Sequence, residues 1–223
     1  MDSSELTERS FKELVKITKL FNIHGLTPII VGGWAVYHYA KKAKSIDIDL
    51  VLPSKQTIQI FENYCKQHGF KKDKRARTRA LFKKEIKTKP GIQEIELDIF
   101  TFSNKNRLAS NNSIEIPWQL SEEHSEKWQL ETNTAARVPK KEVLLLYKAA
   151  ALADRQFKLR TWANLSKVAR DRLRAKIAKD KKDTQSLLNL SINKEKLEQL
   201  LKETGFEKQF NKTIKELKEP NWR

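Results

Sequence analysis

The chain has 223 residues, enough for one large or two small domains, and 39% of them are hydrophobic, enough for a buried core. Its 45 lysine and arginine residues exceed its 28 acidic residues and give a formal net charge of +17. This charge favours a polyanionic partner such as RNA, DNA or a nucleoside triphosphate (NTP) over an acidic phospholipid surface. A well-solvated, lysine-rich surface in a protein from a hot or salty habitat is the alternative that the charge leaves open.

Three features of the sequence predict a soluble, cytoplasmic protein with no membrane partner. Cys65 is the single cysteine, so no intramolecular disulfide can form, as expected in a reducing cytosol. The first ten residues have neither the basic nor the apolar region of a signal peptide. No apolar run is long enough to span a bilayer.

The first predicted elements lead to a candidate anion site. Residues 4–22 have apolar side chains at helical spacing, and Ile29–Val31 is a short apolar strand. Gly32 and Gly33 end this strand, and Trp34–Lys42 continues as a helix. Backbone N–H groups at the positive end of such a helix can bind an anion. A Gly-Gly pair is also common in ordinary turns, so this signal depends on the strand that comes after the helix.

That second predicted strand, Ser45–Leu52, carries two acidic residues. Asp47 and Asp49 are separated by one residue, so their side chains point to the same face of the strand. Ile46, Ile48 and Leu50 then point to the core. Two carboxylates this close repel each other and need a cation, and oxygen ligands of this kind suit Mg²⁺ bridged to phosphate. A metal beside a phosphate-binding helix start indicates phosphoryl or nucleotidyl transfer.

The next segments combine packing and positive charge. A helix with Ile58, Phe61 and Cys65 on its apolar side comes next, and we expect Cys65 in the core rather than as a nucleophile. Residues 71–79 form a basic stretch that leads into Ala80–Ile86. This stretch is either a hairpin with a phosphate-contacting loop or a solvated loop, and the sequence favours neither.

A third predicted strand carries another acidic face. Residues 94–99 alternate between acidic and apolar side chains, which is typical of a strand. Asp98 beside Asp47 and Asp49 would complete a three-carboxylate site able to hold two metal ions, which stabilise the attacking and the leaving oxygen. The alternative is an exposed acidic face at the edge of a sheet.

The predicted boundary between two domains lies at residues 136–140. Ser103–Ser113 is polar and is predicted to be a loop, whereas Ile114–Trp118 and Trp128–Glu131 are short strand candidates. We therefore predict one domain over residues 1–135 and a helical domain over residues 136–223.

Basic residues are the main feature of the second predicted domain. Lys141, Lys148 and Arg155 are spaced by seven residues and share one helix face, where they would either grip a triphosphate or form a solvated basic stripe. Residues 157–182 form a dense basic segment around Trp162, a candidate footprint for a phosphate backbone. Its two acids in the sequence KDKKD, which we expect to pair with lysines rather than to bind metal, are Asp180 and Asp183.

Three motifs, GGWAV, SIDIDLVL and ELDIF, occur in this order and together resemble the nucleotidyltransferase superfamily, whose best-known fold is the polymerase-beta-type palm. The resemblance covers residues 26–102. It implies an α+β fold, with a mixed sheet flanked by helices and then an α-helical C-terminal region. The family places a Gly-Gly or Gly-Ser at a helix start, a D-x-D motif on a strand and a third Asp on a later strand. The residues at these positions are Gly32, Gly33, Asp47, Asp49 and Asp98.

Two branches of the superfamily are similar to this chain. GGWAV and DIDL resemble small antibiotic nucleotidyltransferases that act on aminoglycosides and lincosamides. The second half looks like the AbiEii-type toxin nucleotidyltransferases of toxin–antitoxin systems, which implies an antitoxin protein as a partner. In that branch a Lys on the first C-terminal helix and a K/R-D-x-x-D segment come after the core, and the matching residues are Lys148, Lys179, Asp180 and Asp183. Because aminoglycosides are polycations, the charge of +17 favours RNA, plausibly tRNA, as the acceptor.

The resemblance implies a Mg²⁺-dependent enzyme, with one or two metal ions, that moves a nucleoside monophosphate from an NTP such as ATP to a hydroxyl acceptor. It implies that three residues bind metal and act in catalysis, with the last as a general base: Asp47, Asp49 and Asp98. It implies that four residues contact the phosphates: Gly32, Gly33, Ser45 and Lys148. The competing class is a non-catalytic nucleic-acid-binding protein of the same fold. The acceptor and the base of the NTP stay open.

Overall fold

The computed structural model describes residues 3–41, 44–53, 55–74, 79–88 and 91–218, and the chain divides into two compact units. The first unit comprises residues 1–105 and 118–140, and the second comprises residues 106–117 and 141–223. The predicted boundary at residue 136 therefore falls inside a strand of the first unit. Over the ranges that the structure describes, no helix has the length and apolar character needed to cross a membrane.

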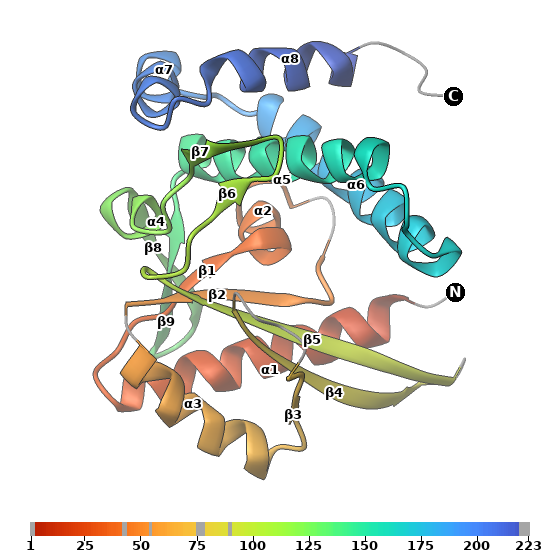
Figure 1. The fold of residues 1–223 in the computed structure, drawn as a ribbon. Helices are drawn as coiled ribbons and strands as arrows, with labels where there is room; N and C mark the ends of the chain where they lie inside the picture. Colours follow the sequence, from red (N-terminus) through yellow and green to blue (C-terminus); the bar gives the residue numbers. More distant parts are fainter. Residues whose placement is uncertain (1–2, 42–43, 54, 75–78, 89–90, 219–223) are drawn as a thin grey trace. The chain divides into compact units, whose positions relative to one another are not determined.

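The first unit is built on a mixed sheet with the strand order β3-β4-β5-β2-β1-β9-β8 (Figure 1). The β2–β5 and β1–β9 pairs are parallel, and the other neighbours are antiparallel. The predicted mixed sheet is thus confirmed. The strands are β1 (Ile29–Val31), β2 (Ile48–Leu52), β3 (Lys71–Lys72), β4 (Ala80–Thr88), β5 (Gly91–Thr101), β8 (Ser125–Glu131) and β9 (Thr134–Pro139).

Helices cover both faces of this sheet. Helix α1 (Ser3–Ile23) and helix α3 (Lys55–Gln67) pack on one face, whereas α2 (Gly32–Ala40) lies on the other (Figure 1). A short helix, α4 (Leu120–Glu123), precedes β8. The apolar residues that flank the acids in β2 and β5 point to the α1 and α3 side, and Leu50 and Leu97 are completely buried. Burial of these residues directs the acids between them to the opposite face, because strand side chains alternate.

The predicted loop Ser103–Ser113 is wrong, because most of it forms a hairpin of the second unit. Strands β6 (Arg107–Leu108) and β7 (Asn111–Glu115) pair antiparallel, and the ion pair Arg107–Glu115 joins them at 2.8 Å. Helix α5 (Lys141–Thr161) of the same unit holds this hairpin, since the backbone N–H of Ala109 donates to the Asp154 carboxylate at 2.9 Å. These contacts are distant in sequence, so the local polar pattern did not reveal the strands.

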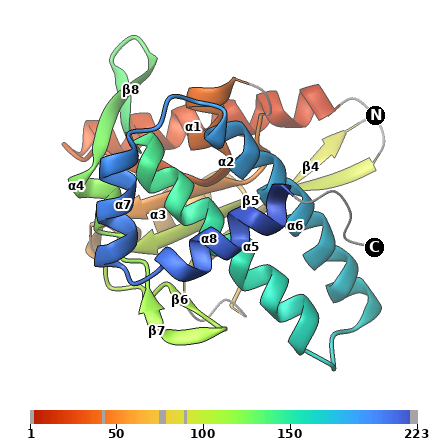
Figure 2. The ribbon, with the colours of Figure 1, turned by 90° about the horizontal axis from the view of Figure 1, so that it is seen from above.

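The second unit is otherwise helical. Its elements are α5 (Lys141–Thr161), α6 (Lys167–Leu188), α7 (Lys194–Glu203) and α8 (Glu207–Lys218). The other three helices pack on α5, which is largely buried along its length (Figure 2). Ser166 and Asn193 cap α6 and α7, because their side-chain oxygens accept hydrogen bonds from backbone N–H groups of the first turn. The predicted α-helical C-terminal region is confirmed.

Candidate active site

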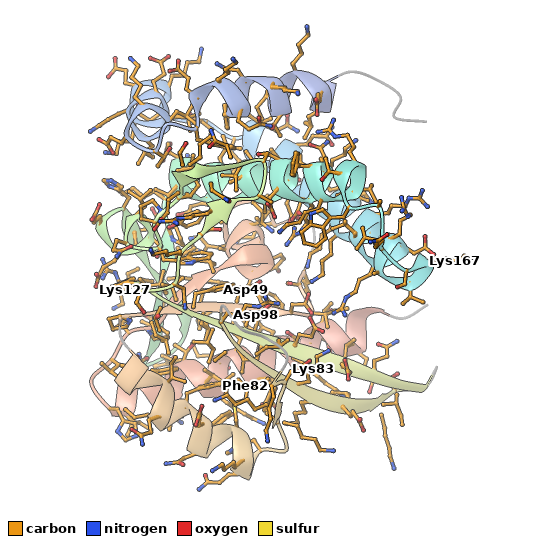
Figure 3. All side chains as sticks on the ribbon, viewed as in Figure 1. Asp49, Phe82, Lys83, Asp98, Lys127 and Lys167 are labelled. Atoms are coloured by element: carbon orange, nitrogen blue, oxygen red, sulfur yellow. The ribbon has the colours of Figure 1, made fainter. Side chains whose placement is uncertain are left out.

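Asp49 and Asp98 occupy neighbouring positions on two parallel strands. Asp49 in β2 is the register partner of Asp98 in β5, and Figure 3 shows the two labels next to each other. Residues in register on adjacent strands face the same side of a sheet, with the strands about 4.8 Å apart. Asp49 is half-buried and Asp98 is only 9% exposed. Strand β5 lies between β4 and β2, so the alternative of an exposed acidic edge is wrong for Asp98.

Gly32 lets the Asp49 carboxylate approach the start of α2. Gly32 has a φ of +65°, and a Cβ atom added to it would lie 2.6 Å from Asp49 Cγ and closer still to Oδ2. A side chain at this position would therefore clash with the carboxylate. Gly33 is buried in the first turn of the same helix. The side chain of Val31, the residue before α2, accepts no hydrogen bond from the backbone amides at the start of this helix.

Asp47 lies just before β2 rather than within it, so the predicted strand beginning at Ser45 is too long. Two side chains hold this segment instead of a strand ladder. Ser45 is buried and its hydroxyl donates to the Asp47 carbonyl at 3.0 Å. Ser10 of α1 donates to the carbonyl of Ile46 at 2.6 Å and accepts from Trp34 Nε1 at 3.2 Å. The position of Asp47 thus depends on side chains from α1 and α2.

Arg79 supplies a positive charge that the sequence did not assign to the site. Its Nε donates to Oδ1 of Asp98, and its side chain is 30% exposed. Arg79 comes directly before β4, which pairs antiparallel with β5. Of the two alternatives left open for residues 71–86, the β3–β4 pairing shows the hairpin, whereas residues 75–78 of the basic stretch lie outside the described residues. The β4–β5 register, in which Ala80 pairs with Ile99, is the signal that would have placed Arg79 beside Asp98.

The carboxylates fit Mg²⁺ as a pair. In the part of the chain that the structure describes, no group of three or more His, Cys, Asp or Glu side chains is arranged to hold a metal ion. Mg²⁺, however, is commonly held by one or two protein carboxylates together with substrate phosphates. Asp49 and Asp98 provide such a pair beside a glycine helix start. The part of Asp47 in metal binding stays a prediction.

Lys148 lies in the second unit, where it is buried between two carboxylates of α6. Its Nζ is 2.7 Å from Asp183 and 3.7 Å from Asp180, and Arg155 also pairs with Asp180. The two aspartates pair with basic residues of α5, Lys148 and Arg155, rather than with the lysines of their own basic segment as predicted. The predicted solvated stripe is wrong for Lys148, because that side chain is only 10% exposed. Its contact with a triphosphate stays a prediction.

The single cysteine of the chain lies in the core of the first unit. Cys65 is 1% exposed, as predicted, and burial raises the pKa of its thiol. A thiol that stays protonated in an apolar environment is a poor nucleophile.

Comparisons with known proteins give likeness in structure only. No protein-family model matches the sequence, and no curated protein matches it. A solved structure of the lincosamide antibiotic adenylyltransferase LnuA, with lincomycin bound, matches at 16% identity and a TM-score of 0.46, over 81% of this chain and 97% of that chain. The antibiotic-resistance factor ANT(2'')-Ia matches at 12% identity and a TM-score of 0.41, over 84% of this chain and 90% of that chain. JHP933 from Helicobacter pylori matches at 17% identity and a TM-score of 0.41, over 96% of this chain and 94% of that chain. At these identities and TM-scores, the likenesses assign neither a substrate nor an acceptor to this chain.

Proposed function

We propose that the protein is a Mg²⁺-dependent nucleotidyltransferase that moves a nucleoside monophosphate from an NTP to a hydroxyl group of RNA. The observation that carries this proposal is the in-register pair Asp49–Asp98 beside the glycine start of α2. It joins a metal-binding carboxylate pair to backbone amides suited to phosphate. The net charge of +17 supports RNA as the acceptor rather than a polycationic antibiotic.

In this proposal the residues of the first unit bind and orient the two substrates. The amides of Gly32 and Gly33 hold the β- and γ-phosphates, while Asp49 and Asp98, with Asp47, hold Mg²⁺. When bound, Mg²⁺ offsets the negative charge of the phosphates. Ser45 and Ser10 hold the backbone of the segment before β2, which carries Asp47.

The transfer is an in-line displacement. The acceptor oxygen forms a bond to the α-phosphorus, the bond from the α-phosphorus to the bridging oxygen breaks, and pyrophosphate leaves. Asp98 takes the proton of the acceptor hydroxyl. Because Arg79 bonds to Asp98, Arg79 must release or share that carboxylate when the proton moves.

Lys148 is the remaining predicted phosphate contact. In the second unit its ammonium already has two carboxylate partners. A triphosphate would therefore have to compete with Asp183 for this ammonium group. Its proposed role is charge neutralisation, which tolerates a shared partner better than a directional hydrogen bond does.

The test supplies purified protein with Mg²⁺, each α-labelled NTP in turn and one of three acceptors: total RNA, a lincosamide or an aminoglycoside. We expect label in RNA and no transfer when the metal is chelated. Asp49→Asn should reduce transfer by more than about 100-fold, because several kcal/mol of transition-state stabilisation depend on this ligand. The matched control is Glu131→Gln, which removes an exposed acid of the same unit from β8, the strand at the far edge of the sheet.

Unfolding in urea measures the stability of the same variants. Asp49→Asn should be at least as stable as the wild type, since it relieves repulsion with Asp98. Undiminished transfer in Asp49→Asn would overturn the proposed site. Label in an antibiotic instead of RNA would overturn the acceptor, and no label with any acceptor would favour a non-catalytic nucleic-acid binder.

A further inference from the structure

The acidic residues of α6 are distributed very unevenly between its two sides. Asp180 and Asp183 are buried and bind Arg155 and Lys148 of α5. Asp171 is the one acid that this fully described helix exposes, and it lies 3.4 Å from Arg174. The inward acids thus neutralise charges of α5 and leave the basic side chains of α6 to the surface.

The surface of α6 is accordingly basic along most of its length. We define the basic face as the exposed lysines and arginines of α6: Lys167, Arg172, Arg174, Lys179 and Lys182. Figure 3 labels Lys167 at the start of this helix. These positions span about four turns, or roughly 22 Å at 1.5 Å per residue, a length along which several successive phosphates of a nucleic acid can lie.

An aromatic side chain adjoins the basic face. Trp162 comes just after the end of α5 and is 49% exposed, with Lys158 Nζ 5.4 Å from its ring centre. Val168 in the first turn of α6 is 78% exposed. An exposed indole beside lysines can stack on an unpaired base while the lysines contact its phosphates. Bases inside a duplex are not available for such stacking.

Helix α7 does not share this charge pattern. Helix α7 has three lysines and three glutamates in alternation: Lys194, Glu195, Lys196, Glu198, Lys202 and Glu203. Among the four helices, α6 has the largest excess of basic over acidic residues, eight against three, compared with five against two in α5 and four against two in α8. A bilayer surface is a poor fit for α6, because a membrane-binding helix needs a broad apolar side opposite its basic one, and the exposed part of α6 has Val168 as its one large apolar residue.

We infer that the basic face of α6, together with Trp162, is a docking surface for single-stranded RNA. This inference deepens the proposed function and rests on it for the role of that RNA as acceptor. The binding itself does not require catalysis. Charge complementarity selects a polyanion, and the exposed indole selects unpaired bases.

The test measures binding of a fluorescent single-stranded RNA longer than about 16 nucleotides, the upper site size of a single-strand-binding domain, by anisotropy over a series of salt concentrations. The α6 variant carries Lys167→Glu, Arg174→Glu and Lys182→Glu. The matched control carries Lys194→Glu, Lys202→Glu and Lys208→Glu, exposed residues of α7 and α8, and has the same net charge. We expect the α6 variant to bind at least about tenfold more weakly, with a salt slope lower by about 2, and the control to bind like the wild type.

The stacking contribution is tested separately. Trp162→Ala should weaken binding of single strands by about fivefold or more, and Trp162→Phe should retain most of the affinity, because phenylalanine also stacks on bases. Neither change should alter the salt slope, since no phosphate contact is lost. The Trp162 pair also keeps the inference testable if the α6 variant does not fold, which circular dichroism checks.

Four outcomes would overturn the inference. The first is an equal loss of RNA affinity in the α6 variant and its control, and the second is tighter binding of duplex than of single-stranded RNA. The third is binding of anionic vesicles but not of RNA, and the fourth is a Trp162→Ala variant with unchanged affinity for single-stranded RNA. Label transfer is measured alongside. If the wild type binds RNA through α6 but transfers no label, the proposed function fails and the docking surface stands. If the α6 variant transfers label to RNA with the wild-type KM, the docking surface fails and the proposed function stands.

Discussion

Asp49 can lie against the start of α2 because Gly32 has no side chain. Two constraints act on this glycine at once. Its φ of +65° is a conformation that costs an L-residue about 1–2 kcal/mol, and its missing Cβ leaves room for the Asp49 carboxylate. The first constraint concerns the backbone alone, whereas the second concerns the candidate active site.

Gly25 separates these two constraints in an experiment. Gly25 has a φ of +69°, but a Cβ atom added there would meet nothing within 4 Å. Gly25→Ala should therefore lower the free energy of unfolding by about 1–2 kcal/mol from backbone strain alone. Gly32→Ala should cost clearly more, because it also displaces Asp49, and it should abolish nucleotidyl transfer. Urea unfolding of both variants measures the difference. Equal costs would mean that the approach of Asp49 is unimportant for stability.

At the scale of elements, α5 and α6 are joined by buried charges. Lys148 and Asp183 are each at most 10% exposed and lie 2.7 Å apart, and Asp180 accepts from Arg155 beside them. A buried ion pair adds little compared with apolar packing, but breaking one leaves an uncompensated buried charge. The Lys148–Asp183 pair thus holds α5 and α6 together, and a triphosphate that contacts Lys148 has to compete with it.

A double-mutant cycle measures this coupling. Lys148→Met should lower the free energy of unfolding by about 3–5 kcal/mol, because it leaves Asp183 buried without this partner. Asp183→Leu should cost less, because Asp180 still lies 3.7 Å from the Lys148 ammonium group. The double variant should cost much less than the sum of the two. Lys141→Met is the control, because Lys141 bonds a backbone carbonyl, that of Ser191, at a more exposed position. Additive costs would show that the two side chains are not coupled.

At the scale of the whole molecule, one buried carboxylate joins three elements of the first unit. Glu13 of α1 accepts from Lys84 of β4 at 3.0 Å and from the Tyr64 hydroxyl of α3 at 3.2 Å. Burial by itself raises the pKa of Glu13, but the hydrogen bond and charge of Lys84, with Lys16 and Tyr64, outweigh it and lower the pKa below its ordinary value of 4.5. The ionised form is therefore favoured in the folded protein.

The acid stability of the protein should depend on this group. Since the native pKa is below the unfolded one, the stabilisation by Glu13 is fully present above about pH 4.5 and is lost as the pH falls through the native pKa. Glu13→Gln should be less stable than the wild type at neutral pH, and the difference should shrink below pH 4.5. The exposed Glu8 on the same helix provides the control Glu8→Gln, which should match the wild type throughout. Urea unfolding at several pH values measures both, and a difference that does not vary with pH would contradict the assignment.

Local patterns were sufficient for much of the first unit. The strand Ile29–Val31, the glycine helix start, the strand with Asp49 and the alternating strand with Asp98 were all predicted, because a strand or helix period is visible within a few residues. The end of a strand is a weaker signal, and Asp47 was placed in β2 although side chains of Ser10 and Ser45 hold it outside.

The sequence alone determined which residues share a face of one strand or helix, since that depends only on neighbours along the chain. Tertiary structure decided which segments meet. It paired Asp49 with Asp98, brought Arg79 to Asp98, assigned residues 106–117 to the helical unit and turned Asp180 and Asp183 inward on α6. Each of these depends on strand register or helix packing between distant segments. Those contacts are selected by the burial and charge of the folded whole, which no local period encodes.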